Sequence, residues 1–359
     1  MSFITRTVIR GALSGLACAG LACIVLASSV QAQNISGAGA TFPYPVYARW
    51  ALAYQQETGI SVNYQAIGSG GGIRQIKERT VTFGATDSPL KPQDLEKAGL
   101  VQFPMIMGGV VPVVNVAGIK PGQLHLDGPT LARIYLGEIE YWDDPAIKAL
   151  NPDLPLPDLA IAPIYRSDGS GTNFLFTNYL SKVSPSFLET VGSSTSVQWP
   201  AGIGARGNEG VAAMAIRTRG AIGYVESAYA KQNKMTHALL KNADGQWVEP
   251  VSESFQAAAA AADWGKAPGY YIILTNQPGA ESWPITGASF ILMHREPRDP
   301  AASASALKFF DWAYKNGAHM AEQLDYVPMP RNVVELVEQT WANDFVRVDG
   351  EALWAGNRQ

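Results

Sequence analysis

Apolar residues in this chain fall into short continuous runs that alternate with stretches of helical spacing. The run Leu159–Tyr165 predicts a buried strand, and beyond it Phe174, Phe176 and Leu180 are spaced for one face of a helix. A turn rich in glycine and serine, residues 166–173, separates the two. Strands and helices alternate in this way along most of the chain, which predicts an α/β fold.

Two further junctions of this kind lie near the N-terminal end. Residues 34–40 predict a short strand that leads through a glycine turn into an amphipathic helix ending at Gly59. Residues 60–67 alternate as a half-buried strand should. Gly68–Gly72 is then expected to be a tight turn, with a helix following over residues 73–79.

The first 32 residues have the pattern of a secretory signal peptide. Arg6 and Arg10 precede an uncharged, apolar run, which closes on a small-x-small cleavage pattern at Ala32. An uncleaved membrane anchor is the rival interpretation, because the run is nearly long enough to span a bilayer. We expect cleavage near Ala32 and export to the periplasm, with a soluble mature protein starting at residue 33.

Two long apolar runs, Phe103–Val116 and Trp283–His294, differ from the other predicted strands. Each is long enough to cross from one folding unit to another. The mature chain is also longer than one hydrophobic core usually serves. We therefore expect two lobes rather than one.

Charge and composition exclude several classes of function. The whole chain has a net charge of −4, and loss of residues 1–32, with two arginines and no acidic residue, changes it to −6. Both cysteines lie in that segment, so the mature protein is expected to fold without disulfides. An acidic chain without basic clusters argues against a nucleic-acid partner. The four histidines lack metal-ligand spacing, and we expect neither a metal site nor a cofactor.

The turn at residues 166–173 carries candidate binding chemistry. A strand, a glycine turn and a helix start direct several backbone N–H groups at one anion. Ser170 and Thr172 add hydroxyl groups, and Arg166 offers a planar fork of donors for oxyanions. Asp168 is placed to hold that fork. A surface turn with a capped helix and a local ion pair is the simpler alternative.

The other junctions offer Thr41 and Phe42, Ser69, and Asp87 at the end of a short strand. Thr41 and Asp87 each have an ordinary alternative as a helix cap. The nucleophile-elbow spacing Gly-x-Ser-x-Gly and the phosphate loop of nucleotide hydrolases are both absent. This set of residues is suited to binding a small oxyanion. A secreted phosphoester hydrolase with Ser170 as nucleophile is the alternative from a different class.

Several motifs together resemble the PstS family, the periplasmic phosphate-binding proteins of the phosphate ABC importer. They cover essentially the whole mature chain and are Gly37–Pro43, Gly68–Gly72, Phe83–Asp87, Asp168–Thr172, Gly220–Val225 and Lys308–Tyr314. The chain departs from the family pattern at Ser167, Gly70 and Thr86, where Ala, Ser and Ser are expected. These changes could alter local contacts but remove no ligand position.

The resemblance implies a type II periplasmic binding protein: two lobes, a hinge of two crossing strands and a ligand cleft between the lobes. It implies lobe I over residues 33–106 plus 282–359, and lobe II over 107–281. The implied phosphate ligands are Thr41, Phe42 (through its backbone N–H), Ser69, Asp87, Arg166, Ser170, Gly171 and Thr172. Asp168 would pair with Arg166.

The function implied is capture of inorganic phosphate and its delivery to an inner-membrane ABC permease with its ATPase subunits, by a monomer without enzymatic activity. Asp87 fits such a site because phosphate keeps a proton that an ionised carboxylate can accept. Sulfate has none, so we expect Asp87 to be the selectivity filter against sulfate and molybdate. A related adhesive or signalling protein could keep the same site.

Overall fold

The structure is a computed structural model that describes residues 35–346 and 350–354. The expected signal peptide, residues 1–32, lies outside the described residues. The described residues form one compact unit. Among the helices described, none combines the length and apolar character needed to cross a bilayer.

The strands form one large sheet and one small sheet. The large sheet has the order β2-β1-β3-β12-β4-β8-β6-β7, with β9 and β13 also paired to β4, and the small sheet has the order β11-β10-β5. The bounds of the strands are β1 Ile35–Gly39, β2 Val62–Ala66, β3 Phe83–Thr86, β4 Leu100–Asn115, β5 His125–Leu126, β6 Ala162–Arg166, β7 Ile203–Ala205, β8 Ala221–Glu226, β9 Thr236–His237, β10 Leu239–Lys241, β11 Trp247–Val248, β12 Thr286–His294 and β13 Val327–Pro328.

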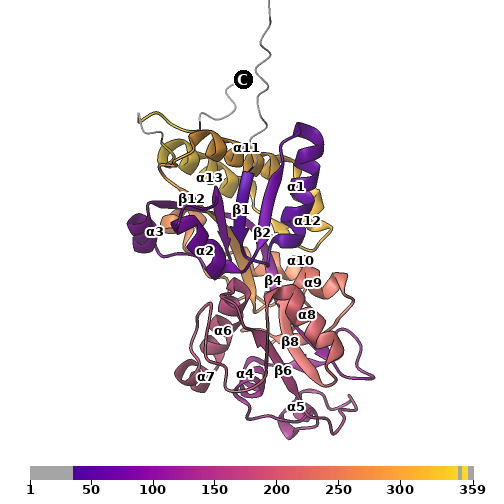
Figure 1. Ribbon diagram of the computed structural model, residues 1–359. Coiled ribbons are helices and arrows are strands. Elements are labelled where there is room, and N and C mark those ends of the chain that lie inside the picture. The colour runs from indigo at the N-terminus through magenta and orange to yellow at the C-terminus, as the bar shows by residue number, and fades with distance from the viewer. Residues whose placement is uncertain (1–34, 347–349, 355–359) are drawn as a thin grey trace, which may run out of the picture. The chain divides into compact units, whose positions relative to one another are not determined.

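Helices cover both faces of the large sheet (Figure 1). Their bounds are α1 Tyr44–Thr58, α2 Ser69–Lys77, α3 Pro92–Ala98, α4 Gly128–Leu136, α5 Pro145–Leu150, α6 Gly171–Val183, α7 Pro185–Thr190, α8 Gly207–Arg217, α9 Ser227–Gln232, α10 Ser252–Ala259, α11 Pro300–Asn316, α12 Ala318–Glu322 and α13 Arg331–Asp344, with short 3₁₀ turns η1 Trp264–Lys266 and η2 Pro268–Tyr270.

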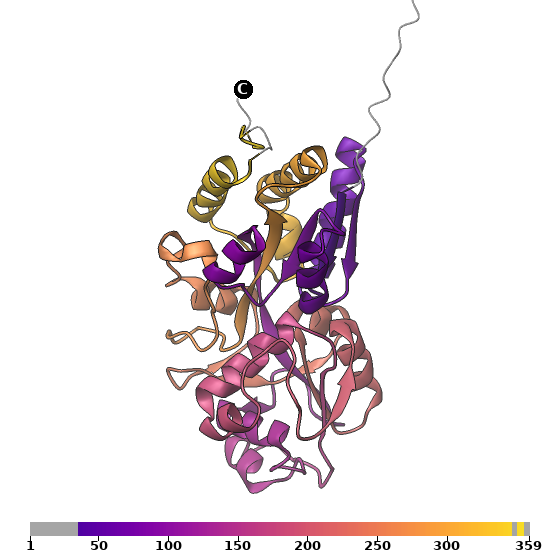
Figure 2. The same cartoon turned by 60° about the vertical axis from the view of Figure 1, so that its left-hand side comes forward.

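The long strand β4 belongs to both parts of the large sheet. Its first ten residues, Leu100–Gly109, pair antiparallel with β12, whereas Val110–Asn115 pair with β8. The two apolar runs expected to cross between lobes correspond to β4 and β12. Strand β4 pairs in both parts of the sheet, whereas β12 pairs with β3 and with the first part of β4. Both views place the first and the last described elements, such as β1 and α13, in one lobe and the middle of the chain in the other (Figure 1; Figure 2).

The protein thus has the two-lobe α/β fold of periplasmic binding proteins. The exact division at 33–106 plus 282–359 and 107–281 stays a prediction. Within the second range, Tyr270 of η2 hydrogen-bonds through its hydroxyl to Thr340 of α13 at 2.7 Å, so this segment contacts an element of the first range.

Each lobe has its own aromatic core. In the first, Phe103 packs edge-on against Phe310 and Trp341, with ring centroids 5.6 and 5.2 Å away. In the second, Phe176 of α6 stacks on Tyr224 of β8 at 4.0 Å. Such pairs fix how each helix lies on its sheet, and the position of the N-terminus of α6 follows from this contact.

The glycine stretch 68–72 is not a separate turn, as the sequence pattern predicts, but the first turn of α2. A Cβ at Gly72 would lie 2.5 Å from Gly39 Cα of β1. The glycines therefore serve to bring α2 against the sheet, and the helix can start earlier than its apolar residues indicate. Helix α11 begins at Pro300, where Asp299 caps it by accepting from Ala302 N at 2.9 Å.

Candidate functional site

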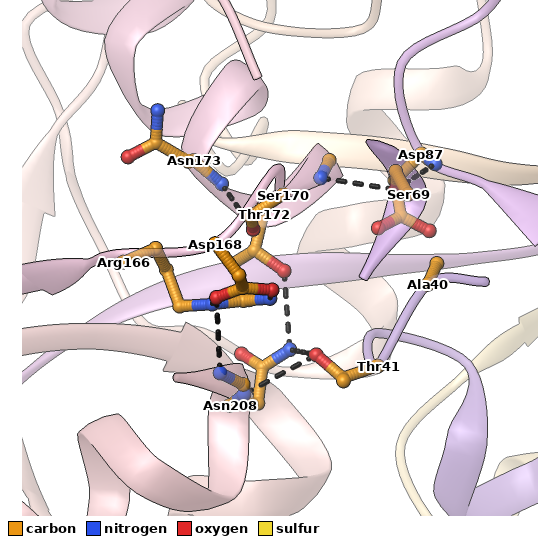
Figure 3. Close-up of polar contacts among 12 residues, drawn as sticks. Ala40, Thr41, Ser69, Asp87, Arg166, Asp168, Ser170, Thr172, Asn173 and Asn208 are labelled. Carbon is orange, nitrogen blue, oxygen red and sulfur yellow. Dashed lines mark hydrogen bonds and ion pairs between the residues drawn. The ribbon is translucent and has the colours of Figure 1, made fainter. Parts of the chain in front are cut away.

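The candidate site forms where the carboxyl ends of parallel strands meet helix N-termini. Thr41 follows β1, Asp87 follows β3, and Arg166 is the last residue of β6. Strands β1 and β3 are parallel neighbours in one lobe, and β6 and β8 are parallel neighbours in the other. In open α/β sheets, ligands bind outside such strand ends. Figure 3 shows the residues that gather there.

Ser69 connects the two lobes at this place. As the first residue of α2, it is fully buried, and its Oγ accepts the backbone N–H of Gly171 at 3.0 Å and that of Asp87 at 3.2 Å (Figure 3). With its oxygen accepting twice, the Ser69 hydroxyl hydrogen is left to donate elsewhere. In this arrangement the Gly171 N–H is engaged by Ser69, so it contacts an anion only by sharing or exchanging that bond.

Gly171 must be glycine for the lobes to meet here. A Cβ at this position would lie 2.5 Å from Asp87 Oδ2 and 2.6 Å from Ser69 Oγ. A second close backbone contact supports the first, because Gly70 N donates to Gly169 O at 2.9 Å. The N-termini of α2 and α6 thus approach each other with both helix dipoles contributing positive potential to the space around Asp87.

Asp87 is the unusual group of the site. It is 1% exposed, and neither carboxylate oxygen forms a hydrogen bond with a described residue, although the hydroxyls of Ser289 and Ser69 lie close enough to lower its pKa. Burial raises its pKa to about 7, although neighbouring hydroxyl groups and the positive charge of Arg166 oppose the rise. A buried acceptor without a donor is costly, so a ligand that brings a proton to Asp87 is strongly favoured.

Arg166 faces the same space from the other lobe. Its Nε and Nη2 form a two-pronged ion pair with the Asp168 carboxylate, at 2.7 and 2.6 Å (Figure 3). Burial opposes ionisation of Asp168, but the hydrogen bonds and charge of Arg166 outweigh it, and the pKa of Asp168 lies below its ordinary value. The remaining nitrogen, Arg166 Nη1, is buried without a partner among the described residues. One end of the guanidinium is therefore fixed and the other is free to donate.

The hydroxyl residues complete the donor set. Ser170 is the N-cap of α6, and its Oγ accepts Asn173 N at 3.0 Å, which leaves its hydrogen free. Thr41 and Thr172 both contact the side-chain amide of Asn208, at 2.7 and 3.1 Å (Figure 3). All eight residues expected to bind the ligand are buried.

Phe42 is held through the peptide units on either side of it. Tyr229 Oη donates to Thr41 O at 2.7 Å, and Tyr326 Oη donates to Phe42 O at 2.6 Å. Thr41 O and Phe42 N–H belong to one planar trans peptide, so they point in opposite directions. A tyrosine on the carbonyl side therefore aims the Phe42 N–H away from α9, on which Tyr229 lies.

Sequence patterns do not reveal Asn208, Tyr229, Tyr326 or Glu226, although all four contact the site or its supports. Asn208 stands in a glycine-rich segment that indicates only the start of a helix. Tyr229 lies on α9 and Tyr326 in the loop before β13, and neither segment carries a motif. A fully buried Glu226 at the end of a strand, with a pKa raised well above its ordinary value by burial, is visible only in the structure.

This arrangement is suited to binding an anion through many donors and one acceptor. Hydroxyl, amide and guanidinium hydrogens surround the single unpaired carboxylate. Within the described residues no group of His, Cys, Asp and Glu is placed to hold a metal ion. The histidines contact other groups: His294 is bonded to Ile76 O, His319 is bonded to Gln323, His125 stacks on Trp247, and His237 lies 3.7 Å from Glu249.

Comparison with known proteins agrees with this geometry. A family model described as a PBP superfamily domain matches residues 27–316. A phosphate-binding protein PstS of Pasteurella multocida is 53% identical over 324 residues, covering 90% of this chain and 94% of that protein. A PstS of Methanocaldococcus jannaschii is 34% identical over 329 residues, covering 84% of each.

Solved structures share the fold. A high-affinity periplasmic phosphate-binding protein with bound phosphate, PfluDING, superimposes with a TM-score of 0.71 at 21% identity, covering 90% of this chain and 96% of that one. A phosphate-binding protein from Stenotrophomonas maltophilia gives a TM-score of 0.66 at 20% identity, covering 86% and 94%. The identities to the PstS relatives, over nearly their whole length, show that this chain belongs to the PstS family of the PBP superfamily.

Proposed function

We propose that this protein captures inorganic phosphate in the periplasm and delivers it to an ABC permease. Membership of the PstS family supports the ligand class. The observation that carries the proposal is the buried Asp87 carboxylate, which has no partner of its own among the described residues and is surrounded by donors from both lobes. Phosphate near neutral pH offers several acceptor oxygens and at least one proton, which is the complement of this set.

The ligand shell we propose consists of Thr41, Phe42 N–H, Ser69, Asp87, Arg166, Ser170, Gly171 and Thr172, with Asp168 supporting Arg166. A net charge near −6 after export cannot attract an anion, so the affinity must come from local donors in a desolvated cleft. Charge-assisted hydrogen bonds contribute about 1.5–3 kcal/mol each. Micromolar binding corresponds to a binding free energy of roughly −8.2 kcal/mol. Several such hydrogen bonds reach this value after the loss of translational and rotational entropy is deducted.

Selectivity against sulfate follows from Asp87. Sulfate has no proton to donate, so an ionised Asp87 would stay unpaired beside a second negative charge. Leaving a buried acceptor unsatisfied costs about 1–3 kcal/mol, and more for a charged group. Because the pKa of Asp87 is about 7, about a tenth of the molecules carry a protonated Asp87 at pH 8, and the discrimination that this group supplies at that pH is about tenfold.

The remaining parts of the proposal concern the location, the partners and the lack of catalytic activity of the protein. We propose cleavage near Ala32, a monomeric periplasmic protein, an inner-membrane permease as partner, no nucleic-acid partner and no catalytic activity. The role of Ser170 Oγ as the cap of α6 supports a binding function for that residue.

The test is isothermal titration of the mature protein, freed of ligand, with phosphate and then with sulfate. We expect one-to-one binding of phosphate and weaker binding of sulfate at pH 8. Asp87→Asn should allow sulfate to compete, whereas Asp153→Asn, the same change on an exposed aspartate, should leave selectivity intact. Exclusion of sulfate by Asp87→Asn would remove the assigned role of Asp87. Turnover of a chromogenic phosphate ester that is lost in Ser170→Ala would contradict the proposal as a whole.

A further inference from the structure

Asn208 lies directly behind the proposed ligand shell. It is the second residue of α8 and is fully buried. Its Nδ2 donates to Thr41 Oγ1 at 2.7 Å and to Thr172 Oγ1 at 3.1 Å, as the dashed lines of Figure 3 show. Because Thr41 follows β1 and Thr172 lies on α6, one amide group connects the two lobes at the site.

The orientation of this amide is fixed by the third contact of the side chain. Asn208 Oδ1 accepts the backbone N–H of Glu226 at 2.9 Å. A backbone N–H can only donate, so the oxygen must face Glu226 and the NH₂ group must face the threonines. The two amide hydrogens are therefore directed to the two hydroxyl oxygens.

This orientation determines what the hydroxyls can do. Thr41 Oγ1 also accepts the backbone N–H of Asn208 at 3.2 Å, so both of its lone pairs are used. Only its hydrogen remains for another partner. Thr172 Oγ1 accepts one amide hydrogen and likewise keeps its own hydrogen to donate. Thr41 therefore cannot compete with Asp87 for the proton of a ligand, and at Thr172 one of the two lone pairs is occupied.

We propose that Asn208 is a positioning residue that makes Thr41 and Thr172 hydrogen-bond donors toward the anion, leaving Asp87 as the acceptor. The inference rests on the proposed binding of phosphate and deepens it. A buried amide could instead serve the fold alone. The two roles differ in one measurable respect: a positioning residue acts on affinity only through the hydroxyls it orients.

The experiment is a mutant cycle read by isothermal titration with inorganic phosphate. Asn208→Ala is made in the wild-type protein and in a Thr41→Val/Thr172→Val protein, in which both hydroxyls are replaced by methyl groups of similar shape. We expect Asn208→Ala to weaken phosphate binding about 10–100-fold in the first background and less than about threefold in the second. Asn208→Ser, taken through the same cycle, replaces any Asn208→Ala protein that fails to fold.

Asn151 provides a matched control. It is also a buried asparagine, 4% exposed, and its amide bonds the backbone of His125 at 2.8 Å, away from the site. Asn151→Ala should lower the melting temperature while changing phosphate affinity less than about twofold in either background.

An equal loss of affinity from the Asn208 change in both backgrounds, or no loss in either, would overturn the positioning role while leaving the proposed function intact. A folded wild-type protein that binds no phosphate would instead remove the proposed function, and this inference with it.

Discussion

At the scale of single residues, we expect the protonation state of Asp87 to determine how strongly the site binds sulfate. With its pKa raised to about 7, the carboxyl group is ionised in about nine of ten molecules at pH 8 and is almost wholly protonated at pH 5.5. A protonated Asp87 can donate to sulfate, which removes the reason for excluding it. Apparent affinity scales with the competent fraction, so wild-type affinity for sulfate should rise about tenfold between pH 8 and pH 5.5.

This prediction is checked by titrating sulfate over that range of pH into wild-type protein and into Asp87→Asn. The amide that this substitution introduces does not titrate, so the variant should show less than about a threefold change. A sulfate affinity that is independent of pH in the wild-type protein would show that the protonation of Asp87 does not set the selectivity.

Arg166 should not be replaceable by lysine, although the charge would be kept. Its guanidinium binds Asp168 through two nitrogens and keeps a third, Nη1, for the ligand. A lysine ammonium cannot reproduce this fixed fork. Loss of one charge-assisted bond is worth about 1.5–3 kcal/mol, so Arg166→Lys should weaken phosphate binding about 10–150-fold by titration. Arg217→Lys, at an exposed position on α8, should have no effect.

At the scale of helices and strands, the site requires the N-termini of α2 and α6 to lie close together. Gly171→Ala would place a methyl group 2.5 Å from Asp87 Oδ2 and force the two helices apart. Phosphate affinity should fall at least about tenfold, because several donors are displaced together. Gly210→Ala is the matched control: its Cβ meets nothing closer than 3.7 Å inside α8, and it should raise stability slightly without changing affinity. Equal affinities for the two variants would contradict the close approach.

Sequence patterns predict most of the helices and strands. They do not predict which of these elements contact each other. Apolar runs identify β4 and β12 because strands buried on both faces are continuously apolar. They do not show that β4 pairs with β12 along one half and with β8 along the other, since pairing depends on contacts distant in the chain. The early start of α2 is missed for a related reason: its glycines follow no helical pattern but are required by contact with β1.

The same limit applies to the site. Thr41, Ser69, Asp87 and the Arg166 stretch stand beside glycine turns, so residue types and family motifs single them out. Asn208 has no such signal, because its importance depends on two hydroxyls 36 and 167 residues away. Residues that bind a ligand can often be found from local patterns, whereas residues that orient the ligand groups require the fold.

At the scale of the whole molecule, the lobes are joined by a buried hydrogen-bond network beneath the site. Tyr326 Oη lies 2.6 Å from Phe42 O and 2.8 Å from Glu226 Oε2. A phenol has one hydrogen for these two oxygens, and the carbonyl can only accept. Both contacts of Tyr326 are satisfied when Glu226 is protonated on Oε2 and donates to Tyr326, which agrees with the pKa of Glu226 being raised well above its ordinary value by burial.

This network predicts how the stability of the ligand-free protein depends on pH. For an acid whose pKa is higher in the folded than in the unfolded state, the folded state binds more protons between the two values. Its contribution to stability is therefore fully present below the ordinary pKa of 4.5 and is lost as pH rises toward the folded value. Glu226→Gln stays neutral at every pH and avoids this loss. The free energy of unfolding of the variant should therefore increase relative to wild type as pH rises from 4.5 to 8.

Urea denaturation in phosphate-free buffers at several pH values measures this difference. Glu335→Gln is the control, because it changes an exposed carboxylate on α13 that is paired with Arg331. The difference in free energy of unfolding between this variant and wild type should vary much less with pH. Parallel pH profiles for wild type and Glu226→Gln would show that Glu226 is ionised in the folded protein. Tyr326 would then donate to Glu226, and Phe42 O would have to be held without it. The pH profile of stability therefore reports which partner orients the Phe42 segment, and so whether the contact between the lobes depends on a buried proton.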